Sequence, residues 1–186
     1  MSEILPHRPV LLILAAFSRY GEALDWALER GAHEFGPLAL TSERFEHRET
    51  RYYEPTMGPD LRKTFLAFER LVEPARLPEL KTATNRWEAE YVDLAKHAES
   101  RPLNLDPGYL TEAKLVLAST KDRDHRVYLG QGIYAEVTLH FSRGAWRTRE
   151  WTYPDYQRAD YHRFFTECRD YLRTRYQKST LPADEP

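Results

Sequence analysis

Three segments of the chain place an acidic residue beside a proline and a tyrosine. They are Tyr52-Tyr53-Glu54-Pro55, Asp106-Pro107-Gly108-Tyr109 and Tyr153-Pro154-Asp155-Tyr156. Proline fixes φ and reduces the freedom that a loop loses when it becomes ordered, so each carboxylate has a stiff support. A catalytic or metal-binding oxygen needs such a support. We therefore predict catalytic roles for Glu54, Asp106 and Asp155, and ligand contacts for the neighbouring Tyr53, Tyr109 and Tyr153.

The same segments also have the composition of ordinary turns. Asp106-Pro107-Gly108-Tyr109 fits a type II turn, with Pro107 at the second position and Gly108 at the third. Asp, Pro and Gly are common in turns for reasons of backbone geometry alone. The catalytic interpretation therefore requires that the three carboxylates meet in space. Under the alternative interpretation they serve only the fold.

Cations and a histidine follow the second of these segments, between residues 114 and 126. A lysine near carboxylates can bind phosphate, and a histidine can act as a general acid or base near neutral pH. We predict that Lys114, Lys121 and Arg126 bind the ligand and that His125 is catalytic. The opposing interpretation is an ordinary charged surface loop at residues 120–124, with a structural histidine beside it.

Residues 125–153 predict two β-hairpins. His125–Leu129 and Ile133–Ser142 flank a glycine-bearing turn at 130–132, and a second hairpin turns at 143–144. Side chains alternate along a strand, so one face of the second strand is predicted to enter the core. Its members are Ile133, Ala135, Val137, Leu139 and Phe141.

The opposite hairpin face combines a charge pair with aromatic side chains. The first turn sets Arg126 opposite Glu136 and Tyr128 opposite Tyr134. The second turn sets Trp151 opposite Glu136 and Tyr153 opposite Tyr134, and such cross-strand neighbours touch. We predict ligand contacts on this face from Arg126, Tyr128, Tyr134, Glu136 and Tyr153. The alternative is a solvated face with one ion pair, which contributes only about 0.2–1 kcal/mol.

Known catalytic and nucleotide-binding motifs are absent from the sequence. There is no G-x-x-x-x-G-K-[ST], G-x-G-x-x-G, G-x-S-x-G, H-E-x-x-H or EF-hand loop. The residues His33, His47, His97 and His162 lack the spacing of metal ligands. A carboxylate site for Mg²⁺ together with a substrate phosphate is compatible with the sequence. No other cofactor is indicated, so the cofactor is unknown.

The pattern of apolar residues predicts an α+β fold with a mostly antiparallel sheet and helices packed on one face. The run Val10–Phe17 is apolar throughout, which favours a central strand covered on both faces. Helices are expected at Glu22–Phe35, from Pro78 onward and at Ala159–Arg175. Leu115–Ser119 is either a buried strand or the end of a short helix. The order strand–helix–strand–strand–helix in the first half is ferredoxin-like.

Length and composition indicate one globular domain over residues 1–178, followed by a disordered tail at 179–186. The chain has 186 residues, a net charge of −2 and a pI of about 6.4. Its overall charge therefore gives no electrostatic attraction to nucleic acid or anionic lipid. A local patch for nucleic acid is not excluded. The single cysteine, Cys168, favours a reducing, cytoplasmic location. No segment predicts a membrane span, and the oligomeric state is unknown.

Four segments together resemble a known family. They are Y-Y-E-P-T-M-G at 52–58, N-L-D-P-G-Y-L at 104–110, H-R-V-Y-L-G-Q-G-I-Y-A-E-V-T-L at 125–139 and T-Y-P-D-Y at 152–156. The chain resembles the uncharacterised bacterial domain-of-unknown-function family 4416 from Pro9 to about Tyr176. The resemblance implies a single-domain member of that family and implies no particular reaction.

Three functional hypotheses follow. The first is a small enzyme that acts on a phosphorylated or nucleotide-like substrate through clustered carboxylates and Lys/Arg side chains. The second is a non-catalytic binding module that uses the aromatic and arginine face of the hairpin for single-stranded RNA or a protein partner. In the third, the protein is an interaction domain whose motifs serve only the fold. Convergence of the carboxylates would favour the enzyme.

Overall fold

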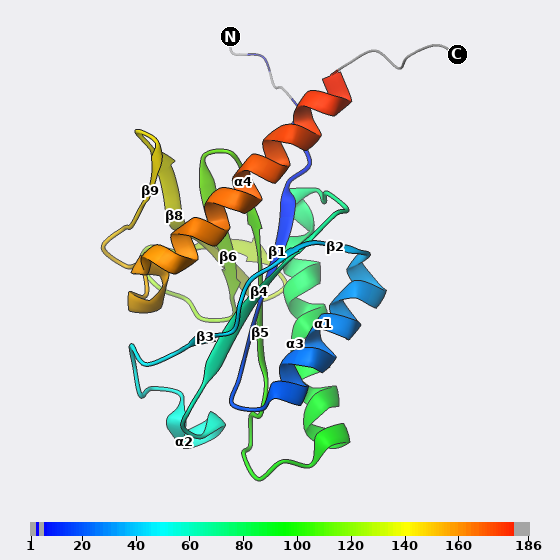
Figure 1. Cartoon of the computed structure of the whole chain (residues 1–186), viewed down its shortest axis with the longest axis vertical. Helices are drawn as coiled ribbons and strands as arrows, with labels where there is room; N and C mark the ends of the chain where they lie inside the picture. The colour runs from blue at the N-terminus through cyan, green and yellow to red at the C-terminus, as the bar shows by residue number, and fades with distance from the viewer. Residues whose placement is uncertain (1–2, 4–5, 181–186) are drawn as a thin grey trace.

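The apolar run near the N-terminus forms a central strand, as predicted. In the computed structural model, which describes residues 3 and 6–180, β1 (Leu11–Ser18) is buried at every position. Within the described residues nine strands form one antiparallel sheet, in the order β2-β4-β1-β5-β6-β8-β7 (Figure 1). The bounds of the other strands on this path are Leu38–Thr41 (β2), Arg62–Phe68 (β4), Asn104–Leu110 (β5), Lys114–Ser119 (β6), Val127–Gly130 (β7) and Ile133–Ser142 (β8). The short strands β3 (Phe45–Glu46) and β9 (Ala145–Arg147) pair with β4 and β8.

The first half of the sheet has the ferredoxin-like arrangement that the sequence predicts. The elements follow one another as β1, α1 (Gly21–Phe35), β2, β4, α3 (Leu77–Ala95) and β5, and their strands lie in the order β2-β4-β1-β5. The two helices pack on the same face of the sheet, against every second residue of β1. These contacts join Leu12 and Leu14 to Leu24, Ala27, Leu80 and Trp87.

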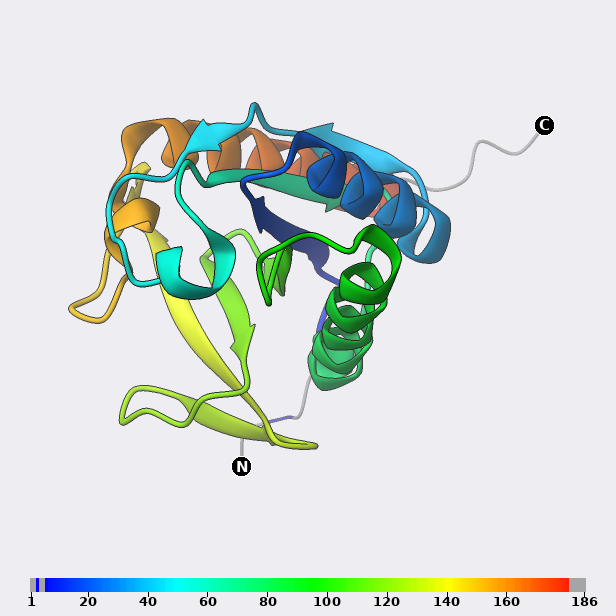
Figure 2. The same ribbon diagram turned by 90° about the horizontal axis from the view of Figure 1, so that it is seen from below.

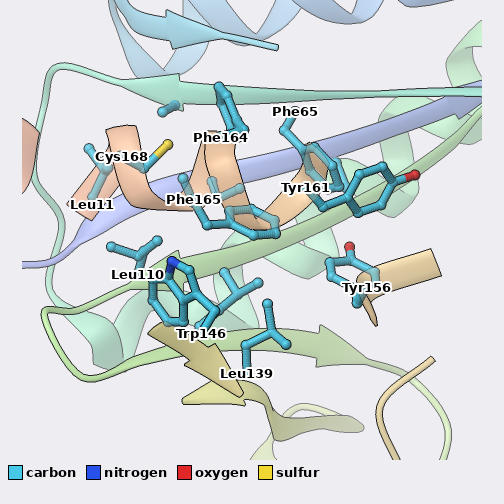
Figure 3. Packing of buried hydrophobic residues seen from close by; sticks show 14 of the residues in the cluster. Leu11, Phe65, Leu110, Leu139, Trp146, Tyr156, Tyr161, Phe164, Phe165 and Cys168 are labelled. Carbon is cyan, nitrogen blue, oxygen red and sulfur yellow. The ribbon is translucent and has the colours of Figure 1, made fainter. Parts of the chain in front are cut away.

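The α+β class and the antiparallel sheet are confirmed, but the helices do not all lie on one face. The last helix, α4 (Ala159–Thr180), covers the face opposite to α1 and α3, and it crosses in front of the sheet in Figure 1. Its residues Phe164 and Phe165 pack against Phe65 of β4, with ring centroids 5.9 and 5.0 Å from that of Phe65 (Figure 3). A strand that is apolar at every position requires this, because half of its side chains would otherwise face water.

The segment Asp106-Pro107-Gly108-Tyr109 is not a turn, which corrects the prediction from its composition. It lies inside β5, where Asp106 is opposite Ala15 and Pro107 is opposite Leu14 of β1. Pro107 removes no hydrogen bond to β6, because β6 pairs with β5 only from Gly108 to Leu110.

Close contact between strands explains the glycine of the same segment. A Cβ atom on Gly108 would lie 2.4 Å from the carbonyl oxygen of Val116 and 2.6 Å from the Leu117 side chain. The glycine is therefore required by the approach of β6, rather than by a positive φ.

The alternation along β8 is interrupted by a β-bulge. Leu115 is opposite Leu139, whereas the next residue, Val116, is opposite Val137, so the register shifts between them. The predicted single core face is therefore divided. Ile133, Ala135 and Val137 pack with Leu77 and Val116, whereas Leu139 belongs to the cluster beneath α4, which Phe141 also contacts.

The two hairpins agree with the prediction near their turns. Tyr128 is opposite Tyr134 in the first hairpin, and Ser142 is opposite Ala145 in the second. The strand β9, however, ends at Arg147, so Trp151 and Tyr153 are not strand partners of Glu136 and Tyr134. Lys114–Ser119 is a strand, which decides between the two alternatives for this segment.

Short helices occupy two of the three segments that combine acid, proline and tyrosine. Glu54–Met57 forms α2, and Pro154–Gln157 forms a 3₁₀ turn, η2. A second 3₁₀ turn, η1 (Pro74–Arg76), precedes α3. The helix α4 continues to Thr180, past the predicted start of the tail at 179, and residues 181–186 of that predicted tail lie outside the described residues. No helix in the described part of the chain has the length and apolar character needed to cross a bilayer.

Candidate functional site

A polar pocket of about 180 Å³ opens where β5 and β6 separate. The two strands pair only through Gly108–Leu110 and Leu115–Leu117, so β5 has no β6 partner before Gly108. Asn104 and Asp106 line the pocket on the β5 side, and residues 117–121 line it on the β6 side. The remaining walls come from α3, β4, β8 and η2, and from the segments that follow β3 and precede β5 and β7. Their residues are His47, Glu49, Thr50, Tyr53, Lys63, Lys81, Asn85, Arg101, Arg126, Glu136 and 153–156. We call this cavity the polar pocket.

Two of the three predicted carboxylates meet at the polar pocket. Asp106 lines it from β5 and Asp155 lines it from η2, although they are 49 positions apart in the sequence numbering. Glu54 does not line the pocket. Its carboxylate instead accepts hydrogen bonds from Arg51 Nε at 3.0 and 3.1 Å. Glu136 of β8 supplies a third carboxylate instead. Acids from three separate elements therefore face one cavity.

The first carboxylate, Asp106, is held by Lys81 of α3. The Lys81 ammonium donates to Asp106 Oδ1 and to the carbonyl oxygen of Leu105, both at 2.8 Å, and Asn104 Nδ2 donates to Asp106 Oδ2 at 2.6 Å. Burial alone raises the pKa of Asp106, but the charge of Lys81 and these hydrogen bonds outweigh burial and lower it to about 2. Because 37% of the Asp106 side chain is open, an ionised carboxylate faces the pocket.

A second layer of charges fixes this corner. Glu88 of α3 accepts hydrogen bonds from the backbone N–H of Leu105 at 2.8 Å and from Arg101 Nη2 at 3.0 Å, and Arg101 also donates to Asn104. Burial raises the pKa of Glu88, against the opposing charges of Lys81 and Arg101. These contacts bind the start of β5 to α3 and so position Asp106.

The second carboxylate, Asp155, is paired with Lys63 of β4. The Lys63 ammonium donates to Asp155 Oδ2, and both side chains are buried. The ammonium also lies 4.9 Å from the ring centre of Tyr156 and 5.0 Å from that of Phe17, in the range of cation–π contacts. His47 lies beside this pair, with Nδ1 3.7 Å from Asp155 Oδ2.

The third carboxylate, Glu136, is paired with Arg126, as the hairpin register predicts. Arg126 Nε donates to Glu136 Oε2 at 2.7 Å, and only 3% of the Arg126 side chain is exposed. The guanidinium also donates to Ser119 Oγ, to the carbonyl oxygen of Lys121 and to the Tyr153 hydroxyl, at 2.7, 2.9 and 3.0 Å. Little of Arg126 is therefore left free for a ligand. Its contacts instead fix the strand end at Ser119 and the loop that carries Tyr153.

His125 lies behind Glu136 rather than in the pocket wall. Its Nε2 is 3.2 Å from Glu136 Oε2, its Nδ1 is 3.1 Å from Asp124 Oδ1, and its ring stacks on Trp151 with centroids 5.1 Å apart. Both ring nitrogens thus have protein partners. A catalytic role for His125 remains a prediction that this geometry does not test.

The other predicted residues divide into those in the pocket and those elsewhere. Tyr53, Lys121 and Tyr153 line the pocket together with the residues described above. Burial, and then the charge of Asp106, raise the pKa of Tyr53, so its phenol remains protonated at neutral pH. Lys114 lies opposite His140 at the far end of β6, Tyr109 packs against the apolar clusters, and Tyr128 and Tyr134 face each other on the outer hairpin.

Several polar residues of the pocket are not among the site residues that the sequence predicts. They are His47, Lys63, Lys81, Asn85, Arg101, Asn104 and Tyr156. A signal exists for Lys81, which follows Leu80 and precedes Thr84 by three positions, and therefore lies on the apolar stripe of its helix. A lysine on a buried helical face requires a partner. That partner, Asp106, lies in a strand 25 positions further along and cannot be identified from the sequence around Lys81.

Each inward-facing carboxylate is bound by a cation, and the carboxylates do not bind one another. In the described residues no three His, Cys, Asp or Glu side chains converge as ligands for a metal ion. A Mg²⁺ site built from one or two carboxylates and a substrate phosphate therefore remains a prediction.

Comparison with known proteins places this architecture in a family. The family model described as a domain of unknown function (DUF4416) matches residues 8–171. The chain belongs to the DUF4416 family. No curated protein matches the chain significantly, and no solved structure does either. The match begins before β1 and ends within α4, and so includes all the residues of the polar pocket.

Proposed function

We propose that this DUF4416 protein is a small enzyme whose active site is the polar pocket, and that it acts on a phosphorylated or nucleotide-like substrate. The observation that carries the proposal is the gathering of Asp106, Asp155 and Glu136, each with its own buried cation, around one cavity. Burial of an ion pair costs several kcal/mol of desolvation per ion, and apolar residues of similar volume are often at least as stabilising. Two such buried pairs, together with the partly open pair of Lys81 with Asp106, surround one cavity, and this favours a chemical role over a purely structural one.

The volume of the pocket narrows the substrate class. Pockets for drug-sized ligands measure roughly 300–1,000 Å³, whereas this pocket measures about 180 Å³. A small phosphorylated molecule therefore suits it better than a complete nucleotide. Lys121 has an exposed side chain whose ammonium contacts the hydroxyl of Tyr52 at 3.3 Å and lies 5.2 Å from the centre of the Tyr52 ring. With no carboxylate bound to it among the described residues, it is the cation most available to a phosphate. Asp106 can accept a hydrogen bond from a substrate hydroxyl or amine.

Isothermal titration with a panel of phosphorylated metabolites and nucleotides, with and without Mg²⁺, tests the proposal. We expect binding to the wild-type chain, and a loss of at least tenfold in affinity for Asp106→Asn, equivalent to about 1.4 kcal/mol. Glu54→Gln is the matched control, because Glu54 is also an acid beside a proline but lies outside the pocket. Equal losses in both variants, or no binding to the wild-type chain across the panel, would contradict the proposal.

The alternative function is a binding module for single-stranded RNA on the outer hairpin. The observation in its favour is that Tyr128 is 58% exposed and pairs with Tyr134 at a centroid distance of 5.2 Å. Stacking on such rings contributes about 1–3 kcal/mol per base. Arg126 is buried and so does not support this alternative. Salt-sensitive RNA binding that Tyr128→Ala weakens at least tenfold would favour the module, and unaltered or absent binding would count against it.

A cytoplasmic location accompanies the enzyme proposal. The single cysteine, Cys168, lies on the buried face of α4, and burial raises the pKa of its thiol. A buried, protonated thiol is unreactive, so it serves packing and gives no reason to expect an oxidising compartment.

A further inference from the structure

His47 is a pocket residue with a buried ring. It follows β3, and its backbone N–H donates to the carbonyl oxygen of Leu61 at 2.9 Å. The ring packs edge-on against Phe17 at a centroid distance of 4.6 Å and lies 6.0 Å from the Tyr53 ring. Only 2% of the side chain is exposed, and neither ring nitrogen has a hydrogen-bond partner among the described residues. Buried polar atoms are rarely left unpaired, so this ring calls for an explanation.

Two carboxylates determine which ring nitrogen carries the proton. Nδ1 is 3.5 Å from Glu49 Oε2 and 3.7 Å from Asp155 Oδ2, and both acids line the pocket. These distances are slightly too long for hydrogen bonds, but they place two acceptors in front of Nδ1. The favoured neutral tautomer therefore has its hydrogen on Nδ1. Nε2 then carries a lone pair, which is the arrangement of a carboxylate-oriented general base.

The charges around the ring keep it neutral in the free protein. Burial lowers the pKa of His47 below its ordinary value of 6.5, and the neighbouring charge of Lys63 lowers it further. Asp155 and Glu49 act in the opposite direction, and Arg158, which binds Glu49 at 2.9 Å, adds to the lowering. A neutral imidazole at physiological pH is ready to accept a proton.

We propose that His47 is the acid–base residue of the polar pocket. This inference rests on the proposed function, because it assigns chemistry to the same site. In the proposed step, His47 Nε2 bonds to the proton of a ligand hydroxyl or bound water while that O–H bond breaks, and the electron pair stays on the oxygen. The imidazolium faces Asp155 and Glu49, which stabilise its charge. The deprotonated oxygen then forms a bond to the phosphorus of the substrate, while the bond between phosphorus and the leaving oxygen breaks. The leaving oxygen takes the proton from Nε2, which restores the neutral ring.

Nitrogen NMR of the histidine rings tests the inference on the unmodified chain, with inorganic phosphate as the probe. His47→Gln serves only to assign the His47 signals, so the test does not depend on the activity of a variant. His162 is the matched control, since its Nε2 lies 2.8 Å from the carbonyl oxygen of Tyr156 and it does not line the pocket. A phosphate bound beside His47 favours the imidazolium, so we expect its pKa to rise by roughly one unit.

The outcomes separate the inference from the proposed function. Hydrogen on Nδ1 in the free protein, together with a phosphate-induced rise in the pKa of His47 and none for His162, supports the inference. If phosphate shifts the backbone amide signals of Asp106 and Lys121 but leaves His47 unchanged, or if the hydrogen is on Nε2, the inference is wrong and the proposed function stands. If neither phosphate nor any phosphorylated metabolite shifts a pocket signal, both are wrong.

Discussion

Single residues in the polar pocket are distinguished by carboxylates that are each paired with a buried cation. Asp106, Asp155 and Glu136 each depend on one cation from another element. The sequence predicts the Arg126–Glu136 pair, because a hairpin register relates residues that are ten positions apart. It does not predict the pairs of Lys81 with Asp106 or of Lys63 with Asp155, because the partners are 25 and 92 positions apart and no local pattern relates them.

The depressed pKa of Asp106 leads to a prediction about acid stability. The folded-state pKa of about 2 lies below the ordinary value of 3.8, so the stabilising contribution of this carboxylate is complete above 3.8 and is lost as the pH falls toward 2. We expect Asp106→Asn to lower the free energy of unfolding at neutral pH and to flatten its decline in this acid range. Urea unfolding at a series of pH values measures both. An acid profile parallel to that of the wild-type chain would contradict the pairing.

At the scale of elements, the sequence predicts those that have a clear period or a clear composition. The helices α1 and α3, the central strand β1 and the turns of both hairpins follow from local patterns. The composition of the β5 segment predicts a turn, because Asp, Pro and Gly together are typical of turns. Its Pro107 and Gly108 in fact fit a strand edge whose neighbour β6 begins to pair only at Gly108 and crosses close to it. Only tertiary contact distinguishes the two cases.

The close approach of β6 gives a prediction for Gly108. We expect Gly108→Ala to lower the free energy of unfolding by about 1–3 kcal/mol or more, because the added methyl group would overlap the backbone oxygen of Val116. The matched control is Gly21→Ala in the first turn of α1, where the nearest atom to a new Cβ, at 3.3 Å, is the flexible end of Arg44. This control should change the stability by less than about 1 kcal/mol. Urea unfolding of both variants decides the matter, and equal effects would count against a contact-based role for Gly108.

At the scale of the whole molecule, helices cover both faces of the sheet, with α3 and α4 on opposite sides (Figure 2), and the pocket lies within the sheet where β5 and β6 separate. The sequence predicts the α+β class and the ferredoxin-like order, but it does not predict which face α4 covers, because an amphipathic helix fits either face of a sheet. The fully apolar β1 is the one indication that both faces are covered. The walls of the pocket come from both sides of the sheet, so its composition depends on the complete fold.

The placement of α4 predicts a large effect for a residue at its centre. Phe165 is fully buried in the cluster that joins α4 to β1 and β4. We expect Phe165→Ala to lower the free energy of unfolding by about 3–5 kcal/mol. Glu167→Ala, on the exposed side of the same helix, should change it by less than about 0.5 kcal/mol. Chemical unfolding of the two variants tests this, and a small effect at Phe165 would mean that α4 does not cover this face.

The central claim is that the polar pocket is the functional site. Its most direct test is a crystal structure of the chain with the phosphorylated compound that binds most tightly in the titration panel. We predict that the compound lies between Asp106 and Asp155, with its phosphate near Lys121 and an oxygen within hydrogen-bonding distance of His47. A compound bound elsewhere, such as on the outer hairpin at Tyr128, with the polar pocket filled only by water, would contradict the claim.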